Sequence, residues 1–367
     1  MKIAVDCRAL TAVRTGGGYY TENLLKALFE VDRDNEYLLC AHRPFDFPRA
    51  GGRAKKIEGN CFSGLLWQNT VLPRVISRER AGLLHSPLFT LPYICGCPGI
   101  ITVFDLTPLL FPELHRAKVR LSFLPLGYSV RKAEKIIAIS EQTKKDLVSC
   151  LGADEDKISV IYPAAAAHFK PAGPEEKKRV KNIYAGGRDY ILHVGTLEPR
   201  KNIEFLIDVF REMLSSGEDN GVNLLLVGSR GWKYGGIFDR ISEYGMEGRV
   251  FWKGYAESGD LPALYSGAEV FVYPTLYEGF GLPLVEALAC GAPAAASAVS
   301  SIPEVLGDAG LLIKGWNVRE WASSIGLLLK DRSTRSEFSM SGLLRSRKFS
   351  WEECARETLE LYNLFGE

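Results

Sequence analysis

Short apolar runs alternate with amphipathic segments along the whole chain. Lys2–Asp6 is the first such run, and an amphipathic stretch from Tyr19 to Phe29 follows it. Brief apolar runs separated by helical patterns predict βαβ units and parallel sheets. In the first half of the chain we expect strands at 2–6, 37–41, 82–85, 100–105, 135–140 and 157–162.

The same pattern restarts after a polar, charged stretch from Lys170 to Arg188, with a domain boundary near Pro163. Strands are expected at 190–194, 222–227, 250–253, 269–273, 293–297 and 310–313. The helix expected from Lys201 carries apolar side chains on one face, namely Ile203, Leu206, Ile207, Phe210 and Met213. We therefore predict an α/β protein with two doubly wound domains. Ligands of such sheets bind at the carboxyl ends of the strands, so two facing sheets would form a central cleft for two substrates.

Composition supports this view and excludes some classes of protein. The chain has 367 residues, of which 46% are hydrophobic and 24% charged, a composition typical of globular proteins. Its length exceeds what one hydrophobic core usually accommodates, which favours two domains. A net charge of +1 disfavours a dedicated nucleic-acid binder, so we expect no nucleic acid partner. Residues 1–165 carry 22 basic and 17 acidic residues, against 23 and 27 in the remainder. This offset indicates either different partners for the two halves or ordinary solvated surface.

The cysteines and the first residues bear on location and metal binding. Only Cys95 and Cys97 lie close together among eight cysteines, so we expect no structural metal site and a reduced, cytoplasmic protein. Asp6 and Arg8 interrupt the apolar run that a signal peptide needs. No apolar stretch approaches the length of a membrane span, so any membrane contact would be peripheral.

The segment Val270–Gly291 is richest in candidate chemistry. A strand leads into the loop Glu278–Gly281, and a helix is expected over Leu282–Cys290. Its glycines and helix start suit a phosphate. The two carboxylates, on Glu278 and Glu286, allow three interpretations: solvated charges, a glycosidase pair about 5–10 Å apart, or ligands for the hydroxyls of a nucleotide sugar. Only the last interpretation uses the glycines, the helix start and both acids.

Two further strand ends carry candidate residues. Arg200 and Lys201 follow a strand and precede a helix, where cations oppose the helix dipole. A diphosphate between them would explain their position, although either side chain could simply reach solvent. A strand followed by a turn with a glycine is also expected at Gly228. It could border a nucleotide, but this pattern is common and therefore a weak indication. Gly16–Gly18 lacks the G-x-G-x-x-G spacing of a dinucleotide site.

Three of these segments together carry a family resemblance. HVGTLEPRKNIEFLIDVF from His193, LLLVGSRGW from Leu224 and EGFGLPLVE at 278–286 resemble the retaining glycosyltransferases of family 4, whose architecture is called GT-B. The resemblance implies two Rossmann-like domains, at 1–165 for the acceptor and 166–348 for the nucleotide sugar. It also implies a C-terminal helix, 349–367, that crosses back to the first domain.

The resemblance further implies the reaction and its participants. A hexose, with mannose as our guess, would move from a GDP-sugar or UDP-sugar to a glycan or lipid-linked acceptor. The configuration would be retained without metal or other cofactor, as in bacterial surface polysaccharide synthesis. Glu278 would contact the sugar, Glu286 the ribose, and Lys201 with Arg200 the diphosphate. The implied catalytic residues are Lys201, Arg200, Glu278 and Asp105, and the implied donor-binding residues are Gly17, Gly18, Gly195, Thr196, Gly228, Ser229, Gly279, Phe280, Gly281, Leu282 and Glu286.

Two departures from the family pattern leave other hypotheses open. Thr196 stands where many relatives have Arg, and Phe104 precedes Asp105 where they have His. The alternative is a non-catalytic nucleotide-sugar-binding subunit that supports a partner transferase, and less favoured is an epimerase. The apolar and basic stretches Arg74–Arg80 and Arg116–Lys132 are candidates for contact with an anionic membrane, or else are ordinary half-buried helices.

Overall fold

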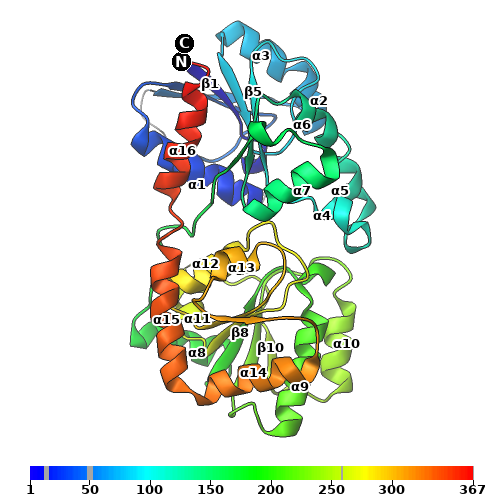
Figure 1. Ribbon diagram of the computed structural model, residues 1–367, viewed down its shortest axis with the longest axis vertical. Coiled ribbons are helices and arrows are strands. Elements are labelled where there is room, and N and C mark those ends of the chain that lie inside the picture. Colours follow the sequence, from blue (N-terminus) through cyan, green and yellow to red (C-terminus); the bar gives the residue numbers. More distant parts are fainter. Residues whose placement is uncertain (12–15, 48–52, 258, 367) are drawn as a thin grey trace. The chain divides into compact units, whose positions relative to one another are not determined.

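The computed structural model describes residues 1–11, 16–47, 53–257 and 259–366, which form two units, each built around one parallel sheet (Figure 1). Unit 1 comprises Met1–Pro163 and Phe349–Glu367, and unit 2 comprises Ala164–Lys348. The predicted α/β fold with two doubly wound parallel sheets is confirmed. No helix within these ranges combines the length and apolar character needed to cross a bilayer.

Unit 1 has a seven-stranded sheet in the order β3-β2-β1-β4-β5-β6-β7, and all neighbouring strands are parallel. Its strands are β1 (Lys2–Asp6), β2 (Glu36–Ala41), β3 (Ala54–Glu58), β4 (Leu83–Ser86), β5 (Gly99–Val103), β6 (Lys135–Ala138) and β7 (Ile158–Val160). Its helices are α1 (Gly16–Val31), α2 (Gly64–Thr70), α3 (Leu72–Glu79), α4 (Thr107–Leu110), α5 (Ala117–Ser122), α6 (Leu126–Lys132), α7 (Glu141–Leu151) and α16 (Trp351–Asn363), with short 3-10 turns η1 (Arg8–Leu10), η3 (Pro112–Leu114) and η4 (Glu155–Lys157).

Unit 2 has a six-stranded sheet in the order β10-β9-β8-β11-β12-β13, again parallel throughout. Its strands are β8 (Tyr190–Val194), β9 (Asn223–Val227), β10 (Val250–Trp252), β11 (Val270–Tyr273), β12 (Ala294–Ser297) and β13 (Leu311–Ile313). Its helices are α8 (Pro174–Tyr184), α9 (Ile203–Ser216), α10 (Gly235–Glu243), α11 (Leu261–Ser266), α12 (Leu282–Ala289), α13 (Ile302–Leu306), α14 (Val318–Lys330) and α15 (Arg332–Ser346), with the 3-10 turn η5 (Pro199–Lys201).

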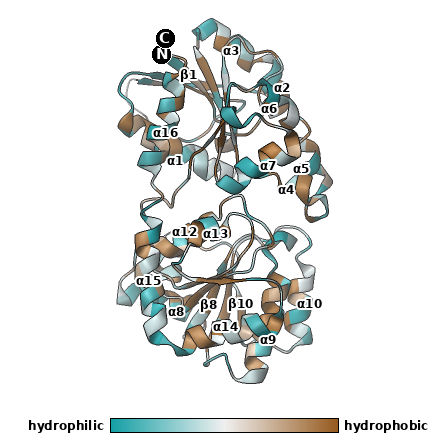
Figure 2. Ribbon diagram, in the orientation of Figure 1, coloured by the Kyte–Doolittle hydropathy of each residue, from teal (hydrophilic) through white to brown (hydrophobic). Residues whose placement is uncertain are grey.

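Burial explains why the strands were visible in the sequence. Every residue of β4, β5, β9, β11 and β12 is buried, as expected where helices cover both faces of a parallel sheet. Figure 2 shows the strands of the second sheet coloured mainly as hydrophobic, whereas the helices carry both colours. The apolar face predicted for α9 is also confirmed, because all five of its named apolar side chains are buried.

Four details differ from the sequence prediction. Strand β3 was missed because it is an edge strand whose Lys55 and Lys56 are exposed. The polar stretch 170–188 contains helix α8, which starts at a proline and buries only Val180. Helix α9 begins at Ile203 rather than Lys201, because Asn202 adopts a left-handed conformation. The glycines at 16–18 form the first turn of α1 rather than a loop before Tyr19.

The last helix belongs to the first unit, as the resemblance implied. Helix α16 (red) lies beside α1 (blue) in Figure 1, and the rings of Tyr20 and Trp351 meet edge to face at 5.6 Å. The Tyr362 hydroxyl and His85 Nδ1 share a hydrogen bond of 2.6 Å. The C-terminal segment therefore completes the helical layer over the first sheet.

Candidate active site

The centre of the second sheet brings together residues that are distant in the sequence. Strands β8 and β11 are neighbours, with β9 and β10 added on one side and β12 and β13 on the other. A crevice opens at such a switch point, at the carboxyl ends of the strands. Lys201 lies in the turn after β8, and Glu278 lies in the loop after β11. The topology therefore joins two side chains that are 77 residues apart.

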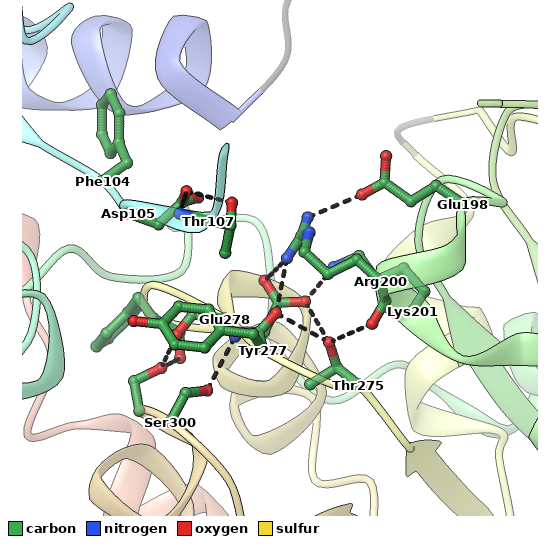
Figure 3. A network of polar contacts seen from close by, with 12 residues as sticks. Phe104, Asp105, Thr107, Glu198, Arg200, Lys201, Thr275, Tyr277, Glu278 and Ser300 are labelled. Atoms are coloured by element: carbon green, nitrogen blue, oxygen red, sulfur yellow. Dashed lines mark hydrogen bonds and ion pairs between the residues drawn. The ribbon is translucent and has the colours of Figure 1, made fainter. Parts of the chain in front are cut away.

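Glu278 is the centre of a network of charges (Figure 3). The Lys201 ammonium donates to Oε1 of Glu278 at 2.5 Å and to the Tyr273 hydroxyl at 2.8 Å. Nη1 of Arg200 lies 2.7 Å from Oε2 of Glu278, and its Nη2 donates to Glu198 at 2.9 Å. Lys201 and Glu278 are both buried. One carboxylate thus bridges two cations, and a second acid holds the outer side of Arg200.

The ionisation of this network follows from its geometry. Burial alone would raise the pKa of Glu278, but the charges of Arg200 and Lys201 outweigh burial and lower that pKa to about 2. Burial lowers the pKa of Lys201, against the opposing effect of Glu278. Glu278 therefore stays ionised at neutral pH and cannot supply a proton. It can orient hydroxyl groups and balance the charge of the two cations.

Hydroxyl side chains fix the loop that carries Glu278. The Thr275 hydroxyl donates to Oε1 of Glu278 at 2.9 Å, and the Glu278 amide donates to Ser300 at 2.9 Å. Ser301 lies within hydrogen-bond distance of the carbonyls of Glu278 and Phe280, at 2.9 and 3.0 Å. The sequence analysis missed all three hydroxyl residues, because nothing in their spacing marks them as partners of the loop.

The same loop positions the start of helix α12. Gly279, Phe280 and Gly281 are buried, and Leu282 is the first helical residue. Gly281 has a φ of 100°, which a side chain would oppose, and a Cβ there would lie 3.0 Å from Ile302. The predicted loop and helix are therefore present. The first backbone amides of a helix have no carbonyl partner within it, and here they follow the loop that carries the Glu278 carboxylate. Such a helix start suits a phosphate.

Two further glycines pack their loops against each other. The Gly195 amide donates to the Val227 carbonyl at 2.9 Å. A Cβ at Gly228 would lie 2.0 Å from the Gly195 carbonyl oxygen, so no side chain fits there. Thr196 and Ser229 are exposed beside this contact. The structure thus brings these four predicted residues together after β8 and β9. Close backbone packing explains Gly228, whereas a Cβ at Gly195 would lie 3.4 Å from His193 and Lys201, an ordinary contact distance.

Glu286 has a different environment from Glu278. It lies within helix α12, partly buried, and the Tyr265 hydroxyl donates to its Oε2 at 2.9 Å. Burial raises the pKa of Glu286 to about 7, although the Tyr265 hydrogen bond opposes that shift. Nothing in the sequence indicated a raised pKa for this carboxyl group. This carboxyl group therefore changes charge near neutral pH, whereas Glu278 does not.

His193 also belongs to this site, although the sequence analysis gave it no role. It is fully buried, donates from Nδ1 to the Val272 carbonyl at 3.1 Å, and stacks on the Tyr273 ring. Burial lowers its pKa to about 4. A neutral imidazole therefore lies under the tyrosine that accepts a hydrogen bond from Lys201.

The predicted residues of unit 1 lie around the first turn of α1 and the end of β5. A Cβ at Gly17 would lie 3.4 Å from the Phe104 ring, which also meets Tyr20 edge to face. Gly18 is buried in the same turn. Oδ1 of Asp105 accepts from the Thr107 amide at 2.9 Å and its hydroxyl at 2.5 Å. Asp105 thus holds Thr107, the first residue of the short helix α4, and Phe104 packs at the position where the family resemblance implies a histidine.

The switch point of unit 1 holds another ion pair. Arg8, after β1, binds Asp6 through Nε at 2.9 Å and Nη2 at 2.7 Å, and Asp6 is fully buried. Nη2 of Arg8 also donates to Thr90 at 3.1 Å. A cavity of about 270 Å³ adjoins this pair, with a mainly apolar lining of Arg8, Leu65, Leu88, Phe89, Thr90, Leu121, Ser122 and Pro125. The sequence analysis used Asp6 and Arg8 only against a signal peptide.

The two apolar and basic stretches of unit 1 differ in how far their apolar side chains are buried. Arg74–Arg80 lies mostly in α3, whose apolar residues Val75 and Ile76 are buried in the core. In Arg116–Lys132, helix α5 has no buried residue, and Leu121 and Leu124 are 63% and 73% exposed. The first stretch is an ordinary half-buried helix. The second offers an exposed apolar and basic surface.

Comparison with known proteins identifies the class. The family model described as "Glycosyl transferases group 1" matches residues 174–343, and "Glycosyltransferase Family 4" matches residues 14–166. The "O-antigen chain mannosyltransferase B" of Escherichia coli is 34% identical over 284 residues, covering 77% of this chain and 74% of that protein. The "Serotype-specific mannosyltransferase WbdA" of Escherichia coli is 28% identical and covers 73% of this chain, which spans only 33% of WbdA.

Solved structures agree on the fold. The crystal structure of Anabaena Alr3699/HepE in complex with UDP and glucose superposes with a TM-score of 0.78 at 19% identity, covering 99% of each chain. WaaG, described as a glycosyltransferase involved in lipopolysaccharide biosynthesis, has a TM-score of 0.75 at 14% identity and covers 98% of this chain and 99% of that chain. At these identities the agreement concerns architecture alone.

Proposed function

The chain belongs to glycosyltransferase family 4, and from this we propose that it moves mannose from GDP-mannose to a glycan or lipid-linked acceptor. The context would be the synthesis of a bacterial surface polysaccharide. The names of the Escherichia coli relatives support the sugar and the context. The observation that carries the proposal is the buried pair of Lys201 and Glu278 at the switch point of unit 2, beside the start of α12.

The charges assign a task to each side chain. Breaking the bond to the anomeric carbon leaves a diphosphate whose negative charge grows in the transition state. Lys201, Arg200 and the N–H groups at the start of α12 would stabilise that growing charge, and preorganised donors do so effectively. Glu278 shares both cations in the free protein. As the diphosphate draws on these cations, the carboxylate becomes available to accept hydrogen bonds from the sugar hydroxyls.

We propose that the configuration is retained through attack on the face that the leaving group departs from. The acceptor oxygen forms its bond to the anomeric carbon as the bond to the diphosphate breaks. The acceptor proton then passes to the departing phosphate oxygen. Glu278 is a poor nucleophile in this scheme because two cations hold its charge. Trapping a sugar covalently attached to a protein side chain would overturn this route.

Metal independence is part of the same proposal. The growing charge on the diphosphate would meet Lys201 and Arg200 instead of a divalent cation. Transfer in the presence of EDTA should match transfer without it. A rate that collapses in EDTA and recovers with magnesium would show that these cations are insufficient.

Unit 1 would bind the acceptor and touch the membrane. The cavity beside Arg8 is mainly apolar, which suits an acceptor with an apolar part. The exposed leucines of the α5 region, accompanied by Arg116, Lys118 and Arg120, would lie on an anionic surface. Sedimentation with phosphatidylglycerol vesicles should fall when Leu121 and Leu124 are both changed to Asp. Unchanged sedimentation would remove the membrane from the proposal.

The function itself is tested with the unmodified chain. Thermal unfolding is followed with UDP, GDP, ADP and their sugars, because a ligand that binds the folded state raises its stability. The nucleotide that stabilises most is then supplied as its sugar with a mannose-containing oligosaccharide, and the product is detected by mass. Binding without transfer or donor hydrolysis would favour the alternative of a supporting subunit, which Phe104 and Thr196 motivate. Free sugar isomers would indicate an epimerase.

A further inference from the structure

The two neighbouring cysteines of unit 1 form a thiol pair that the proposed function does not use. Cys95 and Cys97 lie in the segment that connects β4 to β5, and their sulfur atoms are 3.7 Å apart. Both residues are partly exposed. The segment ends where β5 begins, at Gly99, so the pair lies at the amino end of this strand. Ligands of parallel sheets bind at the opposite edge, and the thiols therefore form a separate site.

The surroundings hold this pair in place and leave it open. The Tyr93 carbonyl accepts hydrogen bonds of 2.7 Å from both the Tyr128 hydroxyl and the Lys132 ammonium, which fix the segment to α6. A cavity of about 410 Å³ is lined by both cysteines together with Leu91, Gly96, Pro98, Gly99, Lys132 and Glu134. A small molecule can thus reach the sulfur atoms, and a cation lines the same cavity.

We propose that Cys95 and Cys97 are a reactive dithiol site for small disulfides such as glutathione disulfide. The Cys95 thiolate attacks one sulfur of the disulfide, forms a mixed disulfide and releases one glutathione thiolate. Cys97 then loses its proton and attacks the Cys95 sulfur, which releases the second glutathione and closes a Cys95–Cys97 bridge. The two protein thiols are oxidised, and glutathione disulfide is reduced to two thiols.

The assignment of Cys95 as the attacking group has a physical basis. The hydrogen bond shared with Cys97, together with the positive charge of Lys132, lowers the pKa of Cys95 to about 6 against the effect of burial. The pKa of Cys97 is raised, because its proton is shared with the Cys95 sulfur and because it is partly buried. The first thiolate to form is therefore on Cys95.

The test is mass mapping of the full chain after brief exposure to glutathione disulfide. The peptide with both cysteines should lose two hydrogens and carry no glutathione. Cys150 is the internal control, because it is exposed and has Ser149 rather than a cysteine beside its sulfur. It should keep any glutathione it acquires. A stable mixed disulfide on the Cys95 peptide, or reaction no faster than at Cys150, would overturn the proposal.

Variants separate the two roles. Cys97→Ser should accumulate glutathione on Cys95, whereas Cys95→Ser should react at Cys97 at least about tenfold more slowly. Lys132→Gln should slow the first step by several-fold.

Phenylarsine oxide, which bridges adjacent thiols, should bind the unmodified chain once and neither single variant. Equal reactivity of the two single variants would reject the assigned order. These readouts do not involve sugar transfer, so their outcome is independent of the proposed function.

Discussion

Both units place a buried ion pair where their strand order reverses, but the two pairs are built differently. In unit 1, Arg8 and Asp6 form a one-to-one, two-pronged contact, and Arg8 also binds structural oxygen atoms of Gly64 and Thr90. In unit 2, Glu278 is shared between Lys201 and Arg200. In the first pair, each nitrogen of the Arg8 guanidinium has an oxygen partner. In the second, Glu278 contacts two cations, so Lys201 or Arg200 can turn to another anion while Glu278 keeps one cation as its partner.

The choice of cation sharpens this difference. Arginine cannot lose its proton in a protein, so Arg8, whose side chain is only 11% exposed, always needs its carboxylate. Lysine can release a proton when it is buried, and burial already lowers the pKa of Lys201. We conclude that the pair in unit 1 holds the fold together, whereas the network in unit 2 is able to redistribute its charge, as the proposed binding of a diphosphate would require.

The largest effect is expected from breaking the pair in unit 1. Asp6→Asn should lower the free energy of unfolding by about 3–5 kcal/mol, because Arg8 stays charged and largely shielded from water without its partner. Denaturant unfolding measures this loss. The double variant Asp6→Asn with Arg8→Met should recover most of it. A double variant as unstable as the single one would show that the pair does not carry the effect.

Lys201→Ala should act on the reaction more than on the fold. The transfer rate at saturating donor should fall about 10²–10³-fold, because the contact strengthens as charge grows on the leaving diphosphate. The KM for the donor should change much less. Lys314→Ala, at an exposed position of the same unit, is the matched control and should leave both constants unchanged. A raised KM with an unchanged rate would place Lys201 in ground-state binding only.

Glu278→Gln should destabilise the fold less than Asp6→Asn, because Lys201 can release its proton when its partner is lost. The pKa of Glu278 in the folded protein, about 2, lies below the usual glutamate value of about 4.3. Its contribution to stability is thus present above about pH 4.3 and is lost as the pH falls towards 2. The stability gap between the two proteins should therefore narrow between pH 5 and 3. A constant gap would indicate that the carboxylate is not held in its charged form.

The smallest effect concerns Glu286. Glu286→Ala should weaken nucleotide binding by about 1–3 kcal/mol, the loss of a charged hydrogen-bond acceptor. Because the pKa of Glu286 is about 7, the affinity of the unmodified protein for GDP should rise between pH 6 and 8 as the carboxylate forms. Calorimetric titration at both pH values measures this rise. Glu286→Gln is the control. Its affinity for GDP should change less between pH 6 and 8, and the change that remains comes from titration of the GDP phosphates.

The sequence was sufficient for the architecture, because buried parallel strands are continuous apolar runs. It was insufficient for β3, where a lysine-rich edge strand resembles a loop, and for α8, which buries a single valine. Helix starts were placed within a few residues. The conformation of Asn202, which delays α9, depends on local geometry that apolar spacing does not encode.

The site was predicted as a set of residues but not as a set of contacts. The motifs pointed to Lys201, Arg200 and Glu278, yet assigned them to different parts of the donor. Their mutual neutralisation arises from the adjacency of β8 and β11, which only the folded sheet establishes. The pKa of Glu286 likewise depends on burial against α11, and Ser300 and Ser301 reach the loop from beyond β12. None of these distances is set by chain spacing.

The return of α16 to unit 1 has a consequence for synthesis on the ribosome. Domains usually fold as the growing chain emerges, amino-terminal part first. Here the helix that covers α1 is translated only after the whole of unit 2. Unit 1 therefore lacks this helix until synthesis of unit 2 is complete. During that interval the side chains of α1 that α16 covers, such as Tyr20, stay exposed to solvent.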